Sequence, residues 1–84
     1  MAEIIMYSTG YCPYCVKARE LLHHKGTSFT DLRIDLQPEL RQEMIAKSGR
    51  HTVPQIFING QHVGGCDDLY ALDAQGTLDQ LLRG

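Results

Sequence analysis

The 84-residue sequence predicts an α/β fold, a four-stranded mixed sheet flanked by helices. Two observations lead to this prediction. The chain begins with a strand, a helix and a second strand, an order that requires a parallel strand pair joined by a right-handed crossover. A further helix precedes an Asn-Gly hairpin, which adds an antiparallel pair to the same sheet before a last helical segment. No repeat or Ser/Pro-rich linker divides the sequence, so we expect a single domain over residues 1–84.

The first strand leads directly into the first helix. Residues 3–7 form a short, mostly apolar run without alternation, which is typical of a central strand covered on both faces. From Pro13 to Lys25 apolar residues recur at helical spacing, and Gly26 provides the stop. The apolar stripe of this amphipathic helix consists of Cys15, Ala18, Leu21 and Leu22.

The second strand and the second helix are indicated by two different periods. Residues 30–36 alternate between polar and apolar side chains, which is the period of two that a strand requires. The apolar face of this strand carries Leu32, Ile34 and Leu36. Pro38 stands where a helix has its N1 proline, and Gly49 closes the helix. The apolar stripe of the second helix is Leu40, Met44 and Ile45.

The last third of the chain contains a hairpin and two helical pieces. Asn59-Gly60 is the strongest short-range signal for a type I′ turn, and it joins predicted strands at residues 55–58 and 61–63. After Gly64-Gly65 the leucines keep helical spacing, and Gly76 divides them into two pieces. These leucines are Leu69, Leu72, Leu78, Leu81 and Leu82.

Charge and hydropathy argue against several classes of function. With 8 Lys and Arg against 10 Asp and Glu, interspersed in sign, the protein is not expected to bind nucleic acid or an anionic membrane. The apolar runs near the start are too short for a signal peptide or a membrane span, so we expect a cytoplasmic protein. In that reducing compartment three cysteines favour catalysis or metal binding over a disulfide framework. Since no long apolar edge or heptad pattern is visible, we expect a monomer.

The motif Cys12-Pro13-Tyr14-Cys15 lies between the first strand and the first helix. At a helix N-terminus the unpaired backbone N–H groups and the macrodipole favour an anion, which makes the thiolate of Cys12 the expected nucleophile. Pro13 suits the first helical turn, where a missing N–H costs nothing. Cys15 lies one turn further on the apolar stripe, so we expect a less exposed, less acidic thiol that attacks a mixed disulfide formed at Cys12.

Two other readings of the cysteines remain open at this point. Cys12, Cys15, His62 and Cys66 could together be counted as a zinc site with three thiolates and one imidazole. The spacing disfavours this zinc site, because zinc ligands usually come as two pairs of residues, each pair close together on a tight turn. Two core cysteines without chemistry are less expected still, because a cysteine at a helix start beside a polar loop is not a core position.

Three motifs along the chain carry a resemblance to a known family. They are the CPYC motif at residues 12–15, Thr52-Val53-Pro54, and the Gly-Gly-Cys-Asp-Asp run at residues 64–68. Over essentially its whole length the sequence resembles the dithiol glutaredoxins, small bacterial members above all. This resemblance implies a thioredoxin-like fold and thiol-disulfide exchange with glutathione as co-substrate. It implies no bound cofactor and no metal.

The resemblance also implies roles for individual residues. Cys12 would be the glutathionylated nucleophile, Cys15 the resolving thiol, and Pro54 would follow a cis peptide bond. The backbone of Val53 would hold the cysteinyl part of glutathione, and Asp67 at a helix start would hold its γ-glutamyl group. The implied glutathione-binding residues are Tyr14, Thr52, Val53, Pro54, Gly65, Cys66 and Asp67. For Asp68, ligand contact and simple helix capping are equally expected.

One position departs from the family pattern. Many glutaredoxins have a lysine three residues before the nucleophile, where this sequence has Thr9. A cationic contact to the glycyl carboxylate of glutathione would then have to come from Arg41 or Arg50, although arginines at such positions are usually solvated surface. Tyr11 and Tyr14 are interpreted as ligand wall or as surface, and Cys66 as a partly buried neighbour of the ligand. His23 and His24 late in the first helix are interpreted as surface residues.

Two reactions are implied by the resemblance. In the monothiol route Cys12 alone reduces protein–glutathione mixed disulfides, and in the dithiol route Cys12 and Cys15 together reduce protein disulfides. The partners would be glutathione and disulfide-containing or glutathionylated proteins, with ribonucleotide reductase as one candidate. Two alternatives stay open: an electron donor reduced directly by thioredoxin reductase, which the run at residues 64–68 disfavours, and an iron–sulfur carrier, which Pro13 disfavours.

Overall fold

A computed structural model describes residues 2–83 of the chain, so the first and last residues of the predicted 1–84 domain lie outside the described part. The elements are β1 (Ile4–Ser8), α1 (Pro13–His24), β2 (Thr30–Arg33), α2 (Glu39–Ser48), β3 (Gln55–Ile58), β4 (Gln61–Gly64), α3 (Cys66–Ala74) and α4 (Thr77–Arg83). The strand order is β2-β1-β3-β4; β1 runs parallel to β2 and antiparallel to β3, and β4 is antiparallel to β3. The predicted four-stranded mixed sheet flanked by helices is therefore confirmed.

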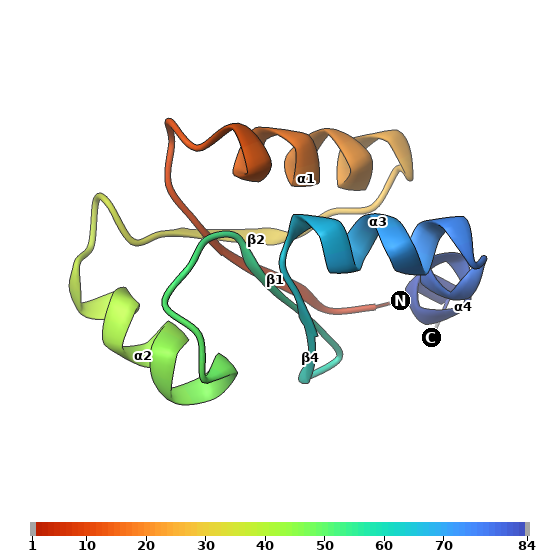
Figure 1. Cartoon of the computed structure of the whole chain (residues 1–84). Coiled ribbons are helices and arrows are strands. Elements are labelled where there is room, and N and C mark those ends of the chain that lie inside the picture. Colours follow the sequence, from red (N-terminus) through yellow and green to blue (C-terminus); the bar gives the residue numbers. More distant parts are fainter. Residues whose placement is uncertain (1, 84) are drawn as a thin grey trace.

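Helices cover both faces of the sheet. Figure 1 shows α1 and α3 on one side and α2 on the other, with α4 beside the two chain ends. Successive side chains of β1 alternate between these layers, as the pleat of a strand requires. Ile4 and Met6 belong to the core under α1 and α3, whereas Tyr7 belongs to the core under α2 with Ile5 packed against it. This explains why the first strand is apolar without alternation: it is central and covered on both faces.

The first helix follows its sequence pattern closely. Cys12 is the N-cap residue and Pro13 occupies the first helical position. The helix ends one residue before the predicted Lys25, whose backbone N–H still bonds to the carbonyl of Leu21. All four predicted stripe residues of this helix are buried: Cys15, Ala18, Leu21 and Leu22. The inward-facing position of Cys15 is thereby confirmed.

The second strand is shorter than the alternation predicted. β2 ends at Arg33, because the N–H groups of Leu36 and Gln37 both bond to the Arg33 carbonyl and close a turn. Ile34 is still buried, but Leu36 is 69% exposed, so its assignment to the apolar face was wrong. Alternation along the sequence continues past the point where the chain must turn toward α2, and periodicity alone does not detect that turn.

The second helix begins one position later than the sequence predicted. Pro38 is the N-cap residue rather than the first helical residue, so the expected N1 proline was wrong, and α2 begins at Glu39. Gly49 follows the helix in the left-handed conformation, with φ of 72°, as its predicted role as a stop requires. Among the residues of α2, Met44 is buried against the sheet and Leu40 and Ile45 pack beside it.

The hairpin and the last two helices are confirmed. Asn59 and Gly60 have φ of 53° and 80°, the two positive values that a type I′ turn requires. β4 extends one residue beyond the predicted end, to Gly64, with a bulge opposite the Ile56–Phe57 step. Gly76 separates α3 from α4, and Leu69 and Leu78 are buried. Within residues 2–83, none of the helices has the length and apolar character needed to cross a membrane.

Candidate functional site

The two cysteines of the CPYC motif occupy different environments. Cys12 lies at the N-cap of α1 and is half-buried, whereas Cys15, one turn later, has no exposed surface. Burial raises the pKa of the Cys15 thiol to about 11, because the thiolate is deprived of water. A backbone hydrogen bond from Thr9 and the charge of Arg19 act in the opposite direction. Cys15 is therefore a protonated, shielded thiol at neutral pH, while Cys12 is the accessible one.

The loop before β3 brings a second segment to Cys12. The Val53–Pro54 peptide bond is cis, as the resemblance implied, and Val53 precedes the first residue of β3 by two positions. The Cys12 thiol donates a long hydrogen bond to the Val53 carbonyl, with Sγ and O 3.8 Å apart. The sheet explains this meeting. Tyr7 near the end of β1 pairs with Gln55 at the start of β3, so the loops that follow and precede these residues lie at the same edge.

The start of α3 forms the third part of the site. Gly65 is the N-cap of α3, and the carboxylate of Asp68 accepts a hydrogen bond from its backbone N–H over 2.9 Å. Gly64 has φ of 124°, and a Cβ there would stand 2.2 Å from the Asp68 carboxylate, so only glycine permits this close approach. Asp68 also pairs with Arg50 over 3.1 Å. The Gly65 N–H and Arg50 lower the pKa of this carboxyl group, which the structure uses as a helix cap.

These three segments enclose a groove of about 310 Å³. Its lining includes every residue that the resemblance assigned to glutathione: Tyr14, Thr52, Val53, Pro54, Gly65, Cys66 and Asp67. Arg50, Gln55 and Asp68 complete it. Of the two arginines considered for a cationic contact, Arg50 lines the groove, and of the two tyrosines Tyr14 does. Thr9 is buried, so its side chain does not take the place of the family's lysine at the surface.

Gln55 is a member of the site that the sequence did not reveal. It is 1% exposed, and its side-chain nitrogen donates to the carbonyl of Thr52 over 3.1 Å and to the Thr52 hydroxyl over 3.2 Å. Its side-chain oxygen lies 2.8 Å from Nε2 of His62. The amide thus connects β4 to the loop that carries Val53 and Pro54. In the sequence Gln55 is simply the first polar residue of a strand, and no local signal distinguishes it.

The remaining candidates form no cluster of metal ligands within the described residues. Within residues 2–83 no three His, Cys, Asp or Glu side chains come together as metal ligands, so the counted set of Cys12, Cys15, His62 and Cys66 is not assembled. Cys66 is buried at the start of α3, and burial raises the pKa of its thiol. His23 and His24 are exposed.

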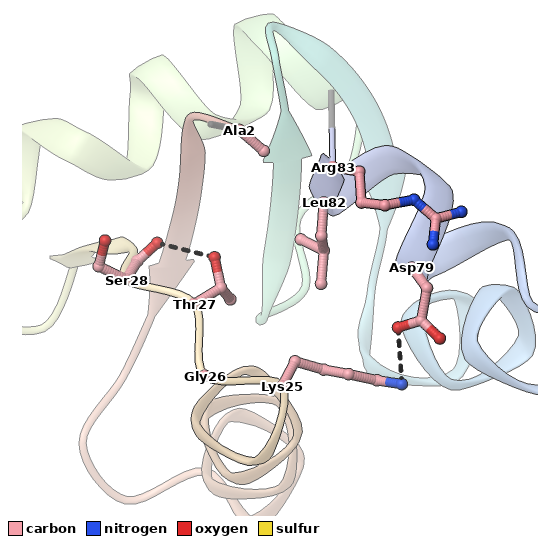
Figure 2. A pocket seen from close by; sticks show the side chains of 8 residues that line it. All are labelled: Ala2, Lys25, Gly26, Thr27, Ser28, Asp79, Leu82 and Arg83. Carbon is pink, nitrogen blue, oxygen red and sulfur yellow. Dashed lines mark hydrogen bonds and ion pairs between the residues drawn. The ribbon is translucent and has the colours of Figure 1, made fainter.

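A larger cavity of about 460 Å³ lies away from the cysteines, between the end of α1 and α4. Figure 2 shows Lys25 reaching across it toward Asp79. The Lys25 ammonium pairs with Asp79 over 2.9 Å and with Asp73 over 2.5 Å. Its cation is therefore engaged in joining α1 to α3 and α4, and no cysteine lines the cavity. Cys66 lines the groove instead, and Cys12 lies beside it against the Val53 carbonyl.

Comparisons with known proteins agree with this geometry. A family model described as Glutaredoxin matches residues 4–63. The chain is 59% identical over 83 residues to Glutaredoxin 3 of Escherichia coli (strain K12), covering 99% of this chain and 100% of that protein. It is 51% identical over 82 residues to a glutaredoxin of Pseudomonas aeruginosa, covering 98% of each. Among solved structures, a buckwheat glutaredoxin–glutathione complex matches with a TM-score of 0.89 and 28% identity, over 95% of this chain and 76% of that one. The solution structure of a glutaredoxin from Brucella melitensis matches with a TM-score of 0.85 and 54% identity, over 98% of this chain and 89% of that one.

Proposed function

The chain belongs to the glutaredoxin family and is a glutathione-dependent thiol-disulfide oxidoreductase with the thioredoxin fold, and from this premise we propose that Cys12 is its nucleophile and Cys15 its resolving thiol. One observation supports the assignment above all others. Cys12 is the accessible thiol at the N-cap of α1, and its sulfur points to the Val53 carbonyl in the groove. Cys15 is buried one turn behind it, where it reaches the sulfur of Cys12 but not a bulky substrate.

The groove of 310 Å³ is the proposed glutathione site. The Val53 backbone, which lies outside the β3 ladder, would hold the cysteinyl part of glutathione like an added strand. The first N–H groups of α3 and the exposed carboxylate of Asp67 would hold the γ-glutamyl end. Tyr14, Thr52, Pro54 and Cys66 would form the walls. Arg50, at the rim, supplies the cation for the glycyl carboxylate, although its pairing with Asp68 must loosen for this contact.

In the monothiol route the Cys12 thiolate attacks the glutathione sulfur of a protein–glutathione mixed disulfide. The bond between that sulfur and the target protein breaks, and the target leaves as a thiolate that takes up a proton. A second glutathione then attacks the Cys12–glutathione disulfide, which releases glutathione disulfide and restores the Cys12 thiolate. Cys15 takes no part in this sequence.

In the dithiol route the Cys12 thiolate opens a protein disulfide and forms a mixed disulfide with the target. Cys15, as its thiolate, attacks the sulfur of Cys12, so that an internal disulfide forms and the target leaves reduced. Two glutathione molecules then reduce the internal disulfide and become glutathione disulfide. Glutathione is thus the co-substrate of both routes, and the proposal requires no bound cofactor.

The substrates are proposed to be glutathionylated and disulfide-containing proteins, with a ribonucleotide reductase disulfide as a candidate for the dithiol route. The exposed Tyr11 and Tyr14 beside Cys12 provide aromatic surface on which a protein substrate can rest. We also propose a monomeric, single-domain protein that works in the cytoplasm, because both routes consume reduced glutathione and a reducing pool supplies it.

The test compares the unmodified chain with Cys12→Ser and Cys15→Ser in two assays. The first assay measures glutathione-dependent reduction of a small glutathionyl mixed disulfide, and the second measures reduction of a protein disulfide. Cys12→Ser is expected to lose both activities. Cys15→Ser is expected to keep the first and lose the second. Activity that remains in Cys12→Ser would overturn the assignment of the nucleophile, and loss of the first activity in Cys15→Ser would overturn the monothiol route.

The same preparations test the two alternatives. If the protein disulfide were reduced with thioredoxin reductase and NADPH but not with glutathione, the thioredoxin-reductase reading would replace the proposal. A brown preparation with cluster absorption, bleached together with loss of a dimer, would favour the iron–sulfur carrier. Colourless, active protein supports the oxidoreductase assignment.

A further inference from the structure

Arg19 of α1 binds the loop that leads from β1 to the active-site helix. Its Nε donates to Oδ2 of Asp31 over 2.7 Å, and one terminal nitrogen donates to Oγ of Ser8 over 2.8 Å and to the Thr9 carbonyl over 3.0 Å. Ser8 is fully buried, and its hydroxyl also donates to Asp31. Groups from β1, β2 and the intervening loop therefore hold the guanidinium in one orientation.

This fixed cation belongs to the same face of α1 as Cys15. The two residues are four positions apart on α1, so their side chains leave the same face of the helix one turn apart. The Thr9 residue that receives a hydrogen bond from Arg19 also contacts Cys15 through its own backbone N–H. The Arg19 side chain is only 20% exposed, so water screens its charge less than that of a surface arginine.

Three charged or titratable side chains interact with Cys15: Cys12, Arg19 and Arg33. Cys12 raises the pKa of Cys15, and Arg19 is the charged side chain that lowers it. Arg33 of β2 also interacts with Cys15, and its Nε and one terminal nitrogen donate to the carboxylate of Asp35 at 2.7 and 2.6 Å.

We propose that Arg19 is a positioning residue for the dithiol route, in which its guanidinium, anchored by Asp31, Ser8 and Thr9, favours the Cys15 thiolate that must attack the mixed disulfide. This inference rests on the proposed roles of Cys12 and Cys15. It adds a residue that takes no part in glutathione binding and does not line the groove. The monothiol route, which Cys15 does not enter, is expected to be indifferent to Arg19.

The step in question is the intramolecular exchange. Cys15 loses its proton to solvent, its sulfur attacks Sγ of Cys12, and the bond between Cys12 and the target protein breaks. The electron pair leaves on the target sulfur, which takes up a proton, so the target is reduced and the cysteine pair is oxidised. A cation beside Cys15 favours the deprotonated form before the attack. Without the cation a smaller fraction of Cys15 is present as thiolate, but each thiolate is a stronger nucleophile. A tenfold loss of thiolate therefore slows the attack by only about threefold at neutral pH.

Arg19→Gln removes the positive charge while keeping a side chain of similar shape. We expect the single-turnover release of a target protein from its mixed disulfide with Cys12 to slow by about threefold or more. The pH at which that release rate levels off should rise. Reduction of a small glutathionyl mixed disulfide, the Cys12-only reaction, should stay within twofold of the unmodified chain. Arg19→Lys keeps the charge and should recover most of the lost rate.

Asp31→Asn distinguishes the effect of the Arg19 charge from the structural effect of the Arg19–Asp31 ion pair. Asp31→Asn and Arg19→Gln break the same ion pair, but they change the charge near Cys15 in opposite directions. If the pair matters only for structure, both variants will slow target release alike. If the cation matters, Asp31→Asn will release the target at least as fast as the unmodified chain does, because the guanidinium stays charged and keeps its bonds to Ser8 and the Thr9 carbonyl. Equal slowing by the two variants would overturn the proposal.

Lys17→Gln is the matched control, because it removes one positive charge from an exposed position on the same helix. It should leave target release unchanged, and slowing equal to that of Arg19→Gln would refute a specific role for Arg19. Cys15→Ser keeps this inference distinct from the proposed function. If Cys15→Ser still releases its target, the assignment of the resolving thiol fails. If Cys15→Ser blocks release while Arg19→Gln does not slow it, only the role of Arg19 fails.

Discussion

The sulfur of Cys12 lies 3.8 Å from the carbonyl oxygen of Val53, although 41 positions separate the two residues along the chain. The contact exists because β1 and β3 are neighbours in the sheet, with Tyr7 opposite Gln55. Cys12 follows the end of β1, and Val53 precedes the start of β3. The proposed nucleophile and the backbone that would hold glutathione thus meet at one edge of the sheet.

Thiol labelling should distinguish the three cysteines. Burial raises the pKa of Cys15 to about 11 and also raises that of Cys66, so both are protonated at neutral pH. Iodoacetamide at pH 7.5 should therefore modify Cys12 alone, as read by peptide mass spectrometry of the native protein. Labelling of Cys15 should rise about tenfold for each pH unit toward 11, as long as the fold persists. Equal labelling of Cys12 and Cys15 at pH 7.5 would contradict the burial difference.

Asp67 and Asp68 should have separable roles. Asp68→Asn weakens the helix cap and the pairing with Arg50, so the free energy of unfolding at pH 7 should fall by about 1 kcal/mol. The folded-state pKa of Asp68 lies below its ordinary value of 3.8. Its stabilisation is therefore complete above that value and is lost as the pH falls through the lower, folded-state pKa. Urea unfolding at pH 7 and at acidic pH measures the difference, which should shrink in acid.

Asp67→Asn is the matched control for that measurement. The Asp67 side chain is exposed, so its substitution should change the free energy of unfolding by less than about 0.5 kcal/mol. It should instead raise KM for glutathione. If Asp67→Asn were the more destabilising variant and left KM unchanged, the division between ligand contact and cap would be reversed.

Gln55→Met should weaken the site by releasing the loop that carries Val53 and Pro54. The variant removes both hydrogen bonds to Thr52 and the contact with His62, which leaves polar partners unsatisfied in a buried place. The expected loss in free energy of unfolding is about 1–3 kcal/mol. Because the loop at residues 52–54 loses its anchor, KM for glutathione should rise more than kcat falls. Gln61→Met, at an exposed position of β4, should leave both constants unchanged.

Met44 and Leu36 compare a buried residue of α2 with an exposed residue of the segment before it. Met44 is fully buried between α2 and the sheet, so Met44→Ala should lower the free energy of unfolding by about 2–5 kcal/mol. Leu36 is exposed beyond the end of β2, and Leu36→Ala should change it by less than about 0.5 kcal/mol. Thermal or urea unfolding compares them. A large effect at Leu36 would restore the longer strand that alternation predicted.

The spacing of apolar residues predicted each helix and strand. That spacing, and the Gly and Pro residues that interrupt it, can be recognised within a short stretch of sequence. Tyr7 and Met44 illustrate the success, and Leu36 and Pro38 the limit. Leu36 continues the alternation of β2, yet the carbonyl of Arg33 closes a turn before it. Pro38 has the right conformation for a helix start, but hydrogen bonding alone decides whether it caps α2 or begins it.

The candidate site divides in the same way. The CPYC motif was placed at a helix start by local pattern, and the glutathione residues came from resemblance to a family. Gln55 and Arg19 escaped both, because their roles depend on partners elsewhere in the fold. Arg19 meets Asp31 from the next strand, and Gln55 meets His62 across the hairpin. A polar residue on a strand or a helix is otherwise read as surface.

The sequence by itself determined the order of elements, the position of Cys12 at a helix N-terminus and the inward side of Cys15, since each depends on residues within one or two turns. Only the tertiary structure decided that residues 52–54 and 65–68 line one groove beside Cys12, that Asp68 caps α3, and that Arg19 bonds to Asp31 and to the loop after β1. The physical reason is the strand order β2-β1-β3-β4. Hydrogen-bonded neighbours in a sheet bring together residues that are far apart along the chain, and no local period encodes which strands will pair.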